Sequence, residues 1–121
     1  MATPGIQAER TASARTVSWA HDNLSLSYRE IGAVLDVDER TVRRWQKAET
    51  TPRGEHRDRL ESLRELRHLL GEVFSTPAEA QEWLHSSVPA FRGRSPISLI
   101  RAGRTEEVIQ VLATIESGAY I

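Results

Sequence analysis

The most constraining feature of this sequence is a pair of short amphipathic segments separated by only three residues. Residues 28–35 and 39–47 each place apolar side chains at helical spacing, and Asp36, Val37 and Asp38 lie between them. Two short helices joined by so tight a turn cannot pack antiparallel, so we expect them to cross steeply. The sequence therefore predicts a bihelical corner rather than a helical hairpin.

Helix-start signals support both segments. Ser27 and Glu30 have the spacing of a capping box, in which the Ser27 hydroxyl accepts from the third helical amide and Glu30 reaches back. Asp38 is the expected N-cap of the second helix. The inner faces of the two helices are expected to bury four apolar side chains: Ile31, Leu35, Val42 and Trp45.

The rest of the chain also shows helix signals, and no stretch of useful length alternates as a strand does. Residues 1–8 are small and polar and are expected to be frayed, and residues 86–94 are expected to form a loop. The sequence therefore predicts an all-α fold. Further helices are expected at Ala12–Asn23, at Glu55–Phe74, from Pro77 to about His85, from Pro96 to before Gly103, and from Thr105 to before Gly118.

Caps and apolar spacing predict the cores of these helices. Thr76 and Thr105 are the expected caps of the helices that follow them. Trp19 is expected near the boundary of its helix, and either Ile109 or Val111 faces inward. The other side chains expected to be buried are Val17, Ala20, Trp83, Leu84, Ile97, Leu99, Ile100, Val108, Leu112 and Ile115.

Residues 55–74 form the longest periodic segment, with a stripe of leucines and a valine three or four residues apart. This stripe offers more apolar surface than one small domain needs. It is interpreted as a dimer seam or, alternatively, as part of the intramolecular core. Its members are Leu60, Leu63, Leu66, Leu70 and Val73, with Leu69 and Phe74 widening it.

The charge of the chain is nearly balanced in sum but uneven along its length. The 121 residues carry a formal net charge of −1, and every basic residue except Lys47 is arginine. Residues 40–53 contain five positive charges against Glu49 alone, and residues 92–104 contain four against none. Genomic base composition is an alternative explanation for the choice of arginine, but it does not explain the clustering.

Several function classes lack support in the residues. There is no cysteine, no membrane-length apolar run and no leader-like N-terminus, so we expect a cytoplasmic protein. The four histidines lack metal-ligand spacing and are expected on helix surfaces, and no glycine-rich phosphate motif or nucleophile motif occurs. We therefore expect no enzyme, no metal, no cofactor, no small-molecule substrate and no membrane partner.

The bihelical corner has the residue types of a DNA-binding helix-turn-helix. Gly32 or Ala33 supplies the small residue where the two helices cross, although alanine is the more usual residue at position 32, and Asp36 stands where the turn most often has glycine. The exposed residues at the start of the second helix would enter the major groove, where arginine pairs with guanine and threonine touches a thymine methyl. The residues predicted for base contacts are Arg40, Thr41, Arg43 and Arg44.

Phosphate contacts are expected around this helix. Lys47 and Arg53 are predicted to meet the DNA backbone, as are the Ser27 and Tyr28 hydroxyls and the amides at the helix start beside them. The alternative is a helix-turn-helix retained only as a scaffold or as a protein-binding surface.

The chain from about residue 24 to residue 121 resembles the antitoxins of the Xre/MbcA/ParS family. The N-terminal corner is similar to the Xre-type module of that family, and the region from about Leu66 onward is similar to its toxin-binding domain. The residues before Asp22 carry no family signal. The resemblance rests on Trp83-Leu84, Pro89-Ala90-Phe91, Arg94-Ser95-Pro96-Ile97, Leu99-Ile100 and Gly103-Arg104, followed by Val108, Leu112, Ile115 and Gly118.

The resemblance implies an antitoxin that blocks an NAD-degrading RES-domain toxin, binds operator DNA of its own operon and forms a homodimer. From this resemblance together with the helix pattern, we expect three regions: a DNA-binding module with its N-terminal arm at residues 1–54, a connecting and dimerisation helix at 55–74, and a toxin-binding domain at 75–121. The alternative is a stand-alone transcriptional regulator whose C-terminal domain only dimerises.

Toxin-binding residues are assigned to the last third of the chain. Arg94, Arg101 and Arg104 are interpreted as a toxin-facing basic patch or, alternatively, as solvated charges. The apolar tail after Gly118 is interpreted as a plug for the toxin's active site or, alternatively, as a segment that folds back on its own core. The full prediction is Arg94, Ser95, Pro96, Arg101, Gly103, Arg104, Gly118, Ala119, Tyr120 and Ile121.

Overall fold

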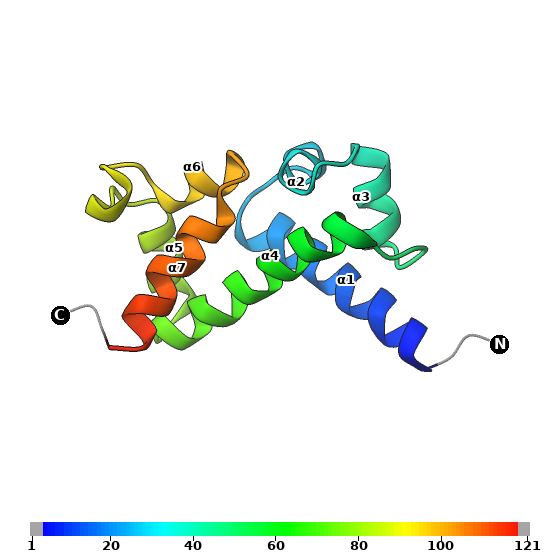
Figure 1. Ribbon diagram of the computed structural model, residues 1–121, viewed down its shortest axis with the longest axis horizontal. Coiled ribbons are helices and arrows are strands. Elements are labelled where there is room, and N and C mark those ends of the chain that lie inside the picture. Colours follow the sequence, from blue (N-terminus) through cyan, green and yellow to red (C-terminus); the bar gives the residue numbers. More distant parts are fainter. Residues whose placement is uncertain (1–3, 119–121) are drawn as a thin grey trace. The chain divides into compact units, whose positions relative to one another are not determined.

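A computed structural model describes residues 4–118 of the chain, and over these residues the fold is all-helical, which confirms the predicted fold class (Figure 1). No helix in this range is long and apolar enough to cross a membrane. The elements in order are α1 (Pro4–Asn23), α2 (Tyr28–Leu35), α3 (Glu39–Gln46), α4 (Gly54–Val73), α5 (Pro77–Leu84), the 3₁₀ turn η1 (Pro89–Phe91), α6 (Pro96–Arg101) and α7 (Thr105–Glu116).

The chain divides into two compact units, Met1–Glu61 and Ser62–Ile121. The boundary lies inside α4, so this helix contributes its first turns to one unit and the rest to the other. The first unit contains α1, α2 and α3, and the second contains α5, η1, α6 and α7.

Helix α1 begins at Pro4, so the expectation of a frayed segment through residue 8 is wrong for residues 4–8. Proline is compatible with the first turn of a helix, where its missing N–H has no partner to lose. Residues 5–9 are exposed and carry no apolar stripe, which is why periodicity did not reveal them. The predicted inner face of α1 is confirmed, since Val17 and Ala20 are fully buried.

The corner of α2 and α3 forms as the sequence predicts. Ser27 and Glu30 make the complete capping box, and Asp38 caps α3 by accepting from the Thr41 amide at 2.8 Å. Asp36 adopts the left-handed conformation with φ of 61°. The four predicted inner residues, Ile31, Leu35, Val42 and Trp45, are all buried.

Gly32 is the small residue that this corner requires. A Cβ atom at position 32 would lie 2.5 Å from the carbonyl oxygen of Val37, closer than real Cβ contacts allow. The Gly32 carbonyl also accepts the Asp36 and Val37 amides, the latter at 2.8 Å. Ala33 is exposed, so of the two candidates Gly32 lies at the close approach.

The leucine stripe of α4 is buried within the single chain. Its five leucines expose between 0% and 8% of their surface, and Val73 and Phe74 are half-buried. This result contradicts the argument that the stripe has surface to spare for a dimer seam. The buried leucines are Leu60, Leu63, Leu66, Leu69 and Leu70.

Three expectations for the second unit are corrected. Trp83 is half-buried rather than buried, because its ring lies beside Phe74 and Phe91, with centroid separations of 5.6 and 6.4 Å, at the edge of the core. Ile115 is also only half-buried, since it is the second-to-last residue of α7, where the helix ends. Pro89–Phe91 forms a 3₁₀ turn inside the predicted loop.

The expectation for Thr105 is also wrong, because Thr105 does not cap α7. It is the first residue of the helix and is buried, and its hydroxyl has no hydrogen-bond partner. Arg104 occupies the cap position and makes no side-chain cap bond. Thr76 and Ser95, by contrast, cap α5 and α6 by accepting from the third helical amide. Of Ile109 and Val111, the buried residue is Ile109.

Candidate functional site

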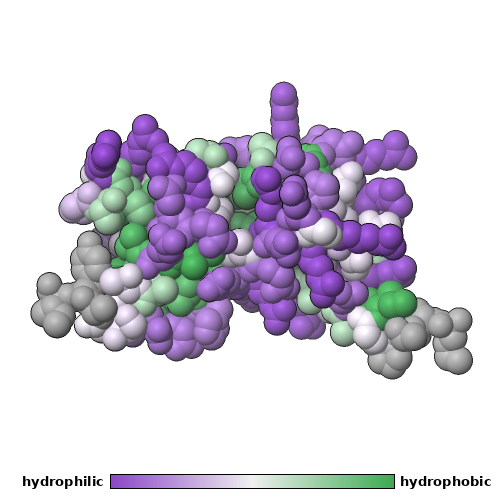
Figure 2. Space-filling model, viewed as in Figure 1, coloured by the Kyte–Doolittle hydropathy of each residue, from purple (hydrophilic) through white to green (hydrophobic). Residues whose placement is uncertain are grey.

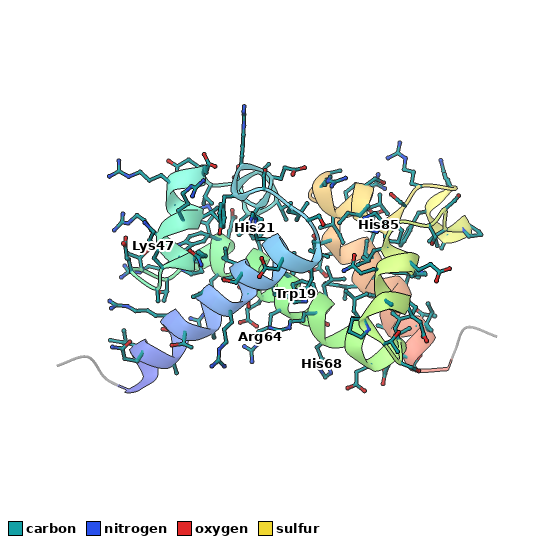
Figure 3. The ribbon with its side chains drawn as sticks, turned by 180° about the vertical axis from the view of Figure 1, so that it is seen from behind. Trp19, His21, Lys47, Arg64, His68 and His85 are labelled. Atoms are coloured by element: carbon teal, nitrogen blue, oxygen red, sulfur yellow. The ribbon has the colours of Figure 1, made fainter. Side chains whose placement is uncertain are left out.

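The exposed side of α3 carries a concentrated positive charge, which we name the α3 basic face. Arg40, Arg43, Arg44 and Lys47 line an open hollow of about 490 Å³ together with Glu49. The surface over α3 is mostly hydrophilic in Figure 2, and Figure 3 places Lys47 at the end of α3. The structure therefore brings four of the predicted DNA-contacting residues to one surface.

Two of these arginines make weak, solvent-exposed ion pairs. Arg43 lies 3.3 Å from Glu39, and Arg44 lies 3.6 Å from Glu49. All four side chains are about half exposed, between 48% and 54%. Pairs of this kind are worth about 0–1 kcal/mol, so a phosphate or a base edge can displace the carboxylates at little cost.

Thr41 and Arg53 lie differently from the other predicted residues. Thr41 is half-buried, and hydrogen bonds from its side chain and its amide hold the pKa of the Asp38 carboxyl below its ordinary value. Its hydroxyl is thus engaged in the cap of α3. Arg53 is exposed just before α4 and is not among the residues lining the hollow.

The start of α2 holds Ser27 and Tyr28. The Ser27 hydroxyl accepts the Glu30 amide at 3.0 Å, and the Glu30 carboxylate accepts the Ser27 amide at 3.0 Å. The amides of Tyr28 and Arg29 lie between these two and have no acceptor within the helix. They are the donors that the capping box leaves for an anion.

Tyr28 is also the centre of an aromatic contact that the residue pattern did not predict. The His21 ring of α1 stacks on the Tyr28 ring, with centroids 4.3 Å apart and an interplanar angle of 8°. The Arg43 guanidinium carbon lies 4.6 Å from the centroid of the same ring. His21 is half-buried and its Nδ1 lies 2.8 Å from the Leu26 carbonyl oxygen.

The histidines divide into two kinds. His68 and His85 are exposed, as expected, but His21 and His56 are half-buried, and His56 lies 6.4 Å from the Trp45 ring. The expectation of four surface histidines is wrong for these two, because each packs against an aromatic ring of its own unit. Within residues 4–118 no three metal-ligating side chains cluster.

The predicted toxin-binding residues of α6 and α7 are partly engaged within the second unit. Arg104 donates to both carboxylate oxygens of Glu107, which raises the pKa of Arg104 and lowers that of Glu107. Arg94 also lowers the pKa of Glu107, so both arginines lie near this carboxylate. Arg92, Arg94, Arg101 and Arg104 are all exposed.

The remaining predicted residues have structural roles or lie outside the described range. Pro96 is buried at the first position of α6, and Ser95 caps that helix. Gly103 and Gly118 are exposed and have positive φ angles of 78° and 76°. The predictions for Ala119, Tyr120 and Ile121 lie outside the described residues.

The second unit also exposes part of its apolar surface, which the sequence analysis did not assign to any site. Val111 and Ile115 lie one turn apart on α7, and both are half-buried. Hydrophobic surface is visible over α7 in Figure 2. Trp83 and Phe74 are likewise half-buried. The weak signal in the sequence was the continuation of the apolar stripe of α7 to Ile115.

Comparisons with known proteins match both units. Residues 69–118 match the family described as the antitoxin Xre/MbcA/ParS C-terminal toxin-binding domain. The mycobacterial cidal antitoxin MbcA of Mycobacterium tuberculosis is 30% identical over 108 residues, which cover 89% of this chain and 95% of the relative. The same figures hold for MbcA of Mycobacterium bovis. The probable mycobacterial cidal antitoxin Rv3188 of M. tuberculosis is 34% identical over 92 residues, covering 76% of this chain and 77% of that protein.

A solved structure agrees with these relatives. The crystal structure of the M. tuberculosis MbcT–MbcA toxin–antitoxin complex contains a chain that matches with a TM-score of 0.60 and 30% identity. The match covers 89% of this chain and 96% of that chain.

Proposed function

Because this chain belongs to the Xre/MbcA/ParS antitoxin family, we propose that it is the antitoxin of a type II toxin–antitoxin system. In this proposal it binds and blocks an NAD-degrading RES-type toxin and represses its own operon. The observation that carries the proposal is the 30% identity, across 89% of the chain, to a protein crystallised in a toxin–antitoxin complex. The NAD-degrading activity of the toxin is what the resemblance implies.

The second unit is proposed to carry the toxin-binding surface. Its exposed arginines Arg94, Arg101 and Arg104 supply positive charge, and the half-buried Val111 and Ile115 supply apolar contact area. An interface with an apolar centre and a polar rim has this composition. Ser95 and Pro96 contribute by fixing the start of α6, and Gly103 and Gly118 by ending α6 and α7. The tail residues Ala119, Tyr120 and Ile121 are proposed to enter the toxin's active-site entrance.

The first unit is proposed to bind operator DNA through the α3 basic face. Arg40, Arg43 and Arg44 would contact base edges, while Lys47 and Arg53 would contact phosphates. Thr41 is left with its methyl group for a thymine, because its hydroxyl is engaged with Asp38. A phosphate is also proposed at the start of α2, where Ser27 and the free amides lie.

A homodimer is part of the proposal, since one helix of this kind reads only one half-site. Because the leucines of α4 are buried in the single chain, we propose that another surface joins the two copies. We expect light scattering of the purified chain to give twice its monomer mass of 13.6 kDa.

Co-expression tests the toxin half of the proposal. The chain is expressed together with the neighbouring reading frame, which the proposal expects to encode a RES-type toxin, and growth and cellular NAD⁺ are measured. We expect the full chain to restore both, and a chain ending at Gly118 to restore neither. Equal protection by the shortened chain would refute the role of the tail in blocking the toxin. A neighbouring reading frame that is not toxic would refute the proposed toxin partner.

Footprinting on the DNA upstream of the gene tests the other half. Replacing Arg40, Arg43 and Arg44 together by alanine is expected to abolish sequence-specific protection while leaving toxin neutralisation intact. The matched control is Arg64→Ala with Arg67→Ala, two exposed arginines of α4. An unchanged footprint in the triple variant would refute base contacts by α3. If the chain binds operator DNA and adding a toxin does not change that binding, the result would favour a stand-alone regulator.

A further inference from the structure

We infer that Tyr28 is a positioning residue for Arg43, acting through its aromatic ring to pre-order the guanidinium that reads the operator. This inference rests on the proposed function, because it concerns how the α3 basic face recognises DNA. It differs from the expectation that Tyr28 acts through its hydroxyl on a phosphate. It is based on two contacts of the Tyr28 ring, one with the His21 ring and one with the Arg43 guanidinium, which bring together one residue from each of the first three helices.

The Tyr28 ring is itself fixed from two directions. Tyr28 is the first residue of α2, and the capping box of Ser27 and Glu30 fixes the backbone at this helix start. Its ring stacks on His21, with centroids 4.3 Å apart and planes within 8° of parallel. The Nδ1 atom of His21 in turn lies 2.8 Å from the carbonyl oxygen of Leu26. The ring therefore provides a rigid surface rather than a mobile side chain.

Arg43 lies against this surface with its hydrogen-bonding capacity preserved. The Cζ atom is 4.6 Å from the ring centroid, within the range of a cation–π contact. The donors of a guanidinium lie in its plane, so a ring that contacts the central carbon does not compete for them. Glu39 holds one terminal nitrogen at 3.3 Å, in an exposed pair that a base edge can displace.

The consequence is a lower entropic cost of recognition. A free arginine loses much of its rotamer freedom when it pairs with guanine, whereas one already held by a ring loses less. The other arginine with an ion pair, Arg44, lies 3.6 Å from Glu49 and has no aromatic neighbour in the described contacts. The structure thus assigns Arg43 as the pre-ordered reader, and Arg44 as the arginine against which this effect is compared.

Selection and binding measurements test the inference. The full-length wild-type chain selects its preferred duplex from a double-stranded pool randomised over a stretch of base pairs. The affinity of each variant is then measured by fluorescence anisotropy for the selected duplex and for a scrambled duplex of the same composition. The readout is the ratio of the two affinities, because a phosphate contact or a loss of folded protein lowers both together.

Tyr28→Leu is expected to lower this ratio by about 2- to 10-fold, the range set by the entropic cost of ordering one free arginine side chain. Tyr28→Phe is expected to restore the ratio to the wild-type value, because it keeps the ring and removes only the hydroxyl. In an Arg43→Ala background Tyr28→Leu should change the ratio no further. The matched control is the Arg44→Ala background. There Tyr28→Leu should lower the ratio by the same factor as it does in the wild-type chain.

Three results would overturn the inference while leaving DNA binding intact. They are a ratio unchanged by Tyr28→Leu, an equal loss in Tyr28→Phe, and additive effects of Tyr28→Leu and Arg43→Ala. A wild-type chain that prefers no duplex from the pool would instead overturn the proposed DNA function, and the inference with it.

A second measurement needs no DNA. In the free protein, the Arg43 side-chain proton resonances should show an upfield ring-current shift that persists in Tyr28→Phe and is lost in Tyr28→Leu. Tyr28→Gln serves as a second ring deletion. Unshifted Arg43 resonances in the wild type would refute the contact directly.

Discussion

The close approach at Gly32 predicts that the same substitution has opposite effects at two glycines. Alanine at an exposed helical position is normally more stable than glycine by about 1 kcal/mol. At Gly32 the added methyl group would lie 2.5 Å from the Val37 carbonyl oxygen, whereas ordinary contact begins at 3.4 Å. The turn between α2 and α3 must therefore move by about 1 Å, the kind of displacement that accompanies overpacking.

The magnitude follows from three contributions. Overpacking costs about 1–3 kcal/mol. Moving the turn also weakens the bonds that the Asp36 and Val37 amides donate to the Gly32 carbonyl, each worth about 0.5–1.5 kcal/mol. Against these losses stands the gain of about 1 kcal/mol in helix propensity. We expect Gly32→Ala to lower the free energy of unfolding of the first unit by about 1–3 kcal/mol.

Gly71 provides the matched control. It lies inside α4, is exposed, and a Cβ atom there would meet nothing within 4 Å. Gly71→Ala should therefore raise the stability by about 0.5–1 kcal/mol. Thermal unfolding followed by circular dichroism measures both, at about 4–8 °C per kcal/mol for a domain of this size. Amide hydrogen exchange assigns each change to its unit. If Gly32→Ala raised the melting temperature as Gly71→Ala does, the reasoning about the close approach would be refuted.

Two further predictions concern helix starts. Thr105→Val should leave the free energy of unfolding unchanged or raise it by about 1 kcal/mol, because the buried Thr105 hydroxyl has no hydrogen bond to lose. Urea unfolding measures this difference. A free energy of unfolding lowered by about 1 kcal/mol would show that the hydroxyl is hydrogen-bonded in solution. Asp38→Ala should lower the melting temperature at pH 7, and Asp38→Asn should lower it less, because an amide oxygen still caps. The folded-state pKa of Asp38 lies below its unfolded value, so its stabilisation is complete above about pH 4 and is lost as the pH falls through the folded pKa. A difference between Asp38→Ala and wild type that stayed constant down to pH 2 would contradict this account.

Local signals predicted the parts of the fold that depend on neighbours in sequence. The capping box at Ser27, the N-cap Asp38 and the left-handed Asp36 each involve residues within a few positions of one another, and all three were predictable. The small residue at the crossing was predicted too, as one of two adjacent positions. The structure selects Gly32, because the choice depends on which side of α2 meets the turn.

Features that depend on distant residues were not predictable in the same way. The start of α1 at Pro4 has no apolar stripe to reveal it, and the half-exposure of Trp83 depends on Phe74 and Phe91 from other elements. Thr105 has the residue type of a cap, but it is buried inside the first turn of α7.

The candidate site shows the same division. The charge of the α3 basic face could be read from Arg40 to Lys47, because four basic residues at helical spacing share an exposed side. The pair of Arg43 with Glu39 follows from the i, i+4 rule. The stack of His21 on Tyr28 joins α1 and α2 across the connecting residues 24–27, and nothing in the residue types at those positions signals it.

The most direct test of the proposed antitoxin function is the rate of NAD⁺ consumption by the proposed RES-type toxin partner, measured as the purified chain is titrated into it. We expect consumption to fall in proportion to the added chain and to stop at a fixed stoichiometry. The triple variant lacking Arg40, Arg43 and Arg44 should inhibit equally well, because these residues belong to the other unit. Consumption that continues unchanged at excess chain would contradict the claim that this protein neutralises such a toxin.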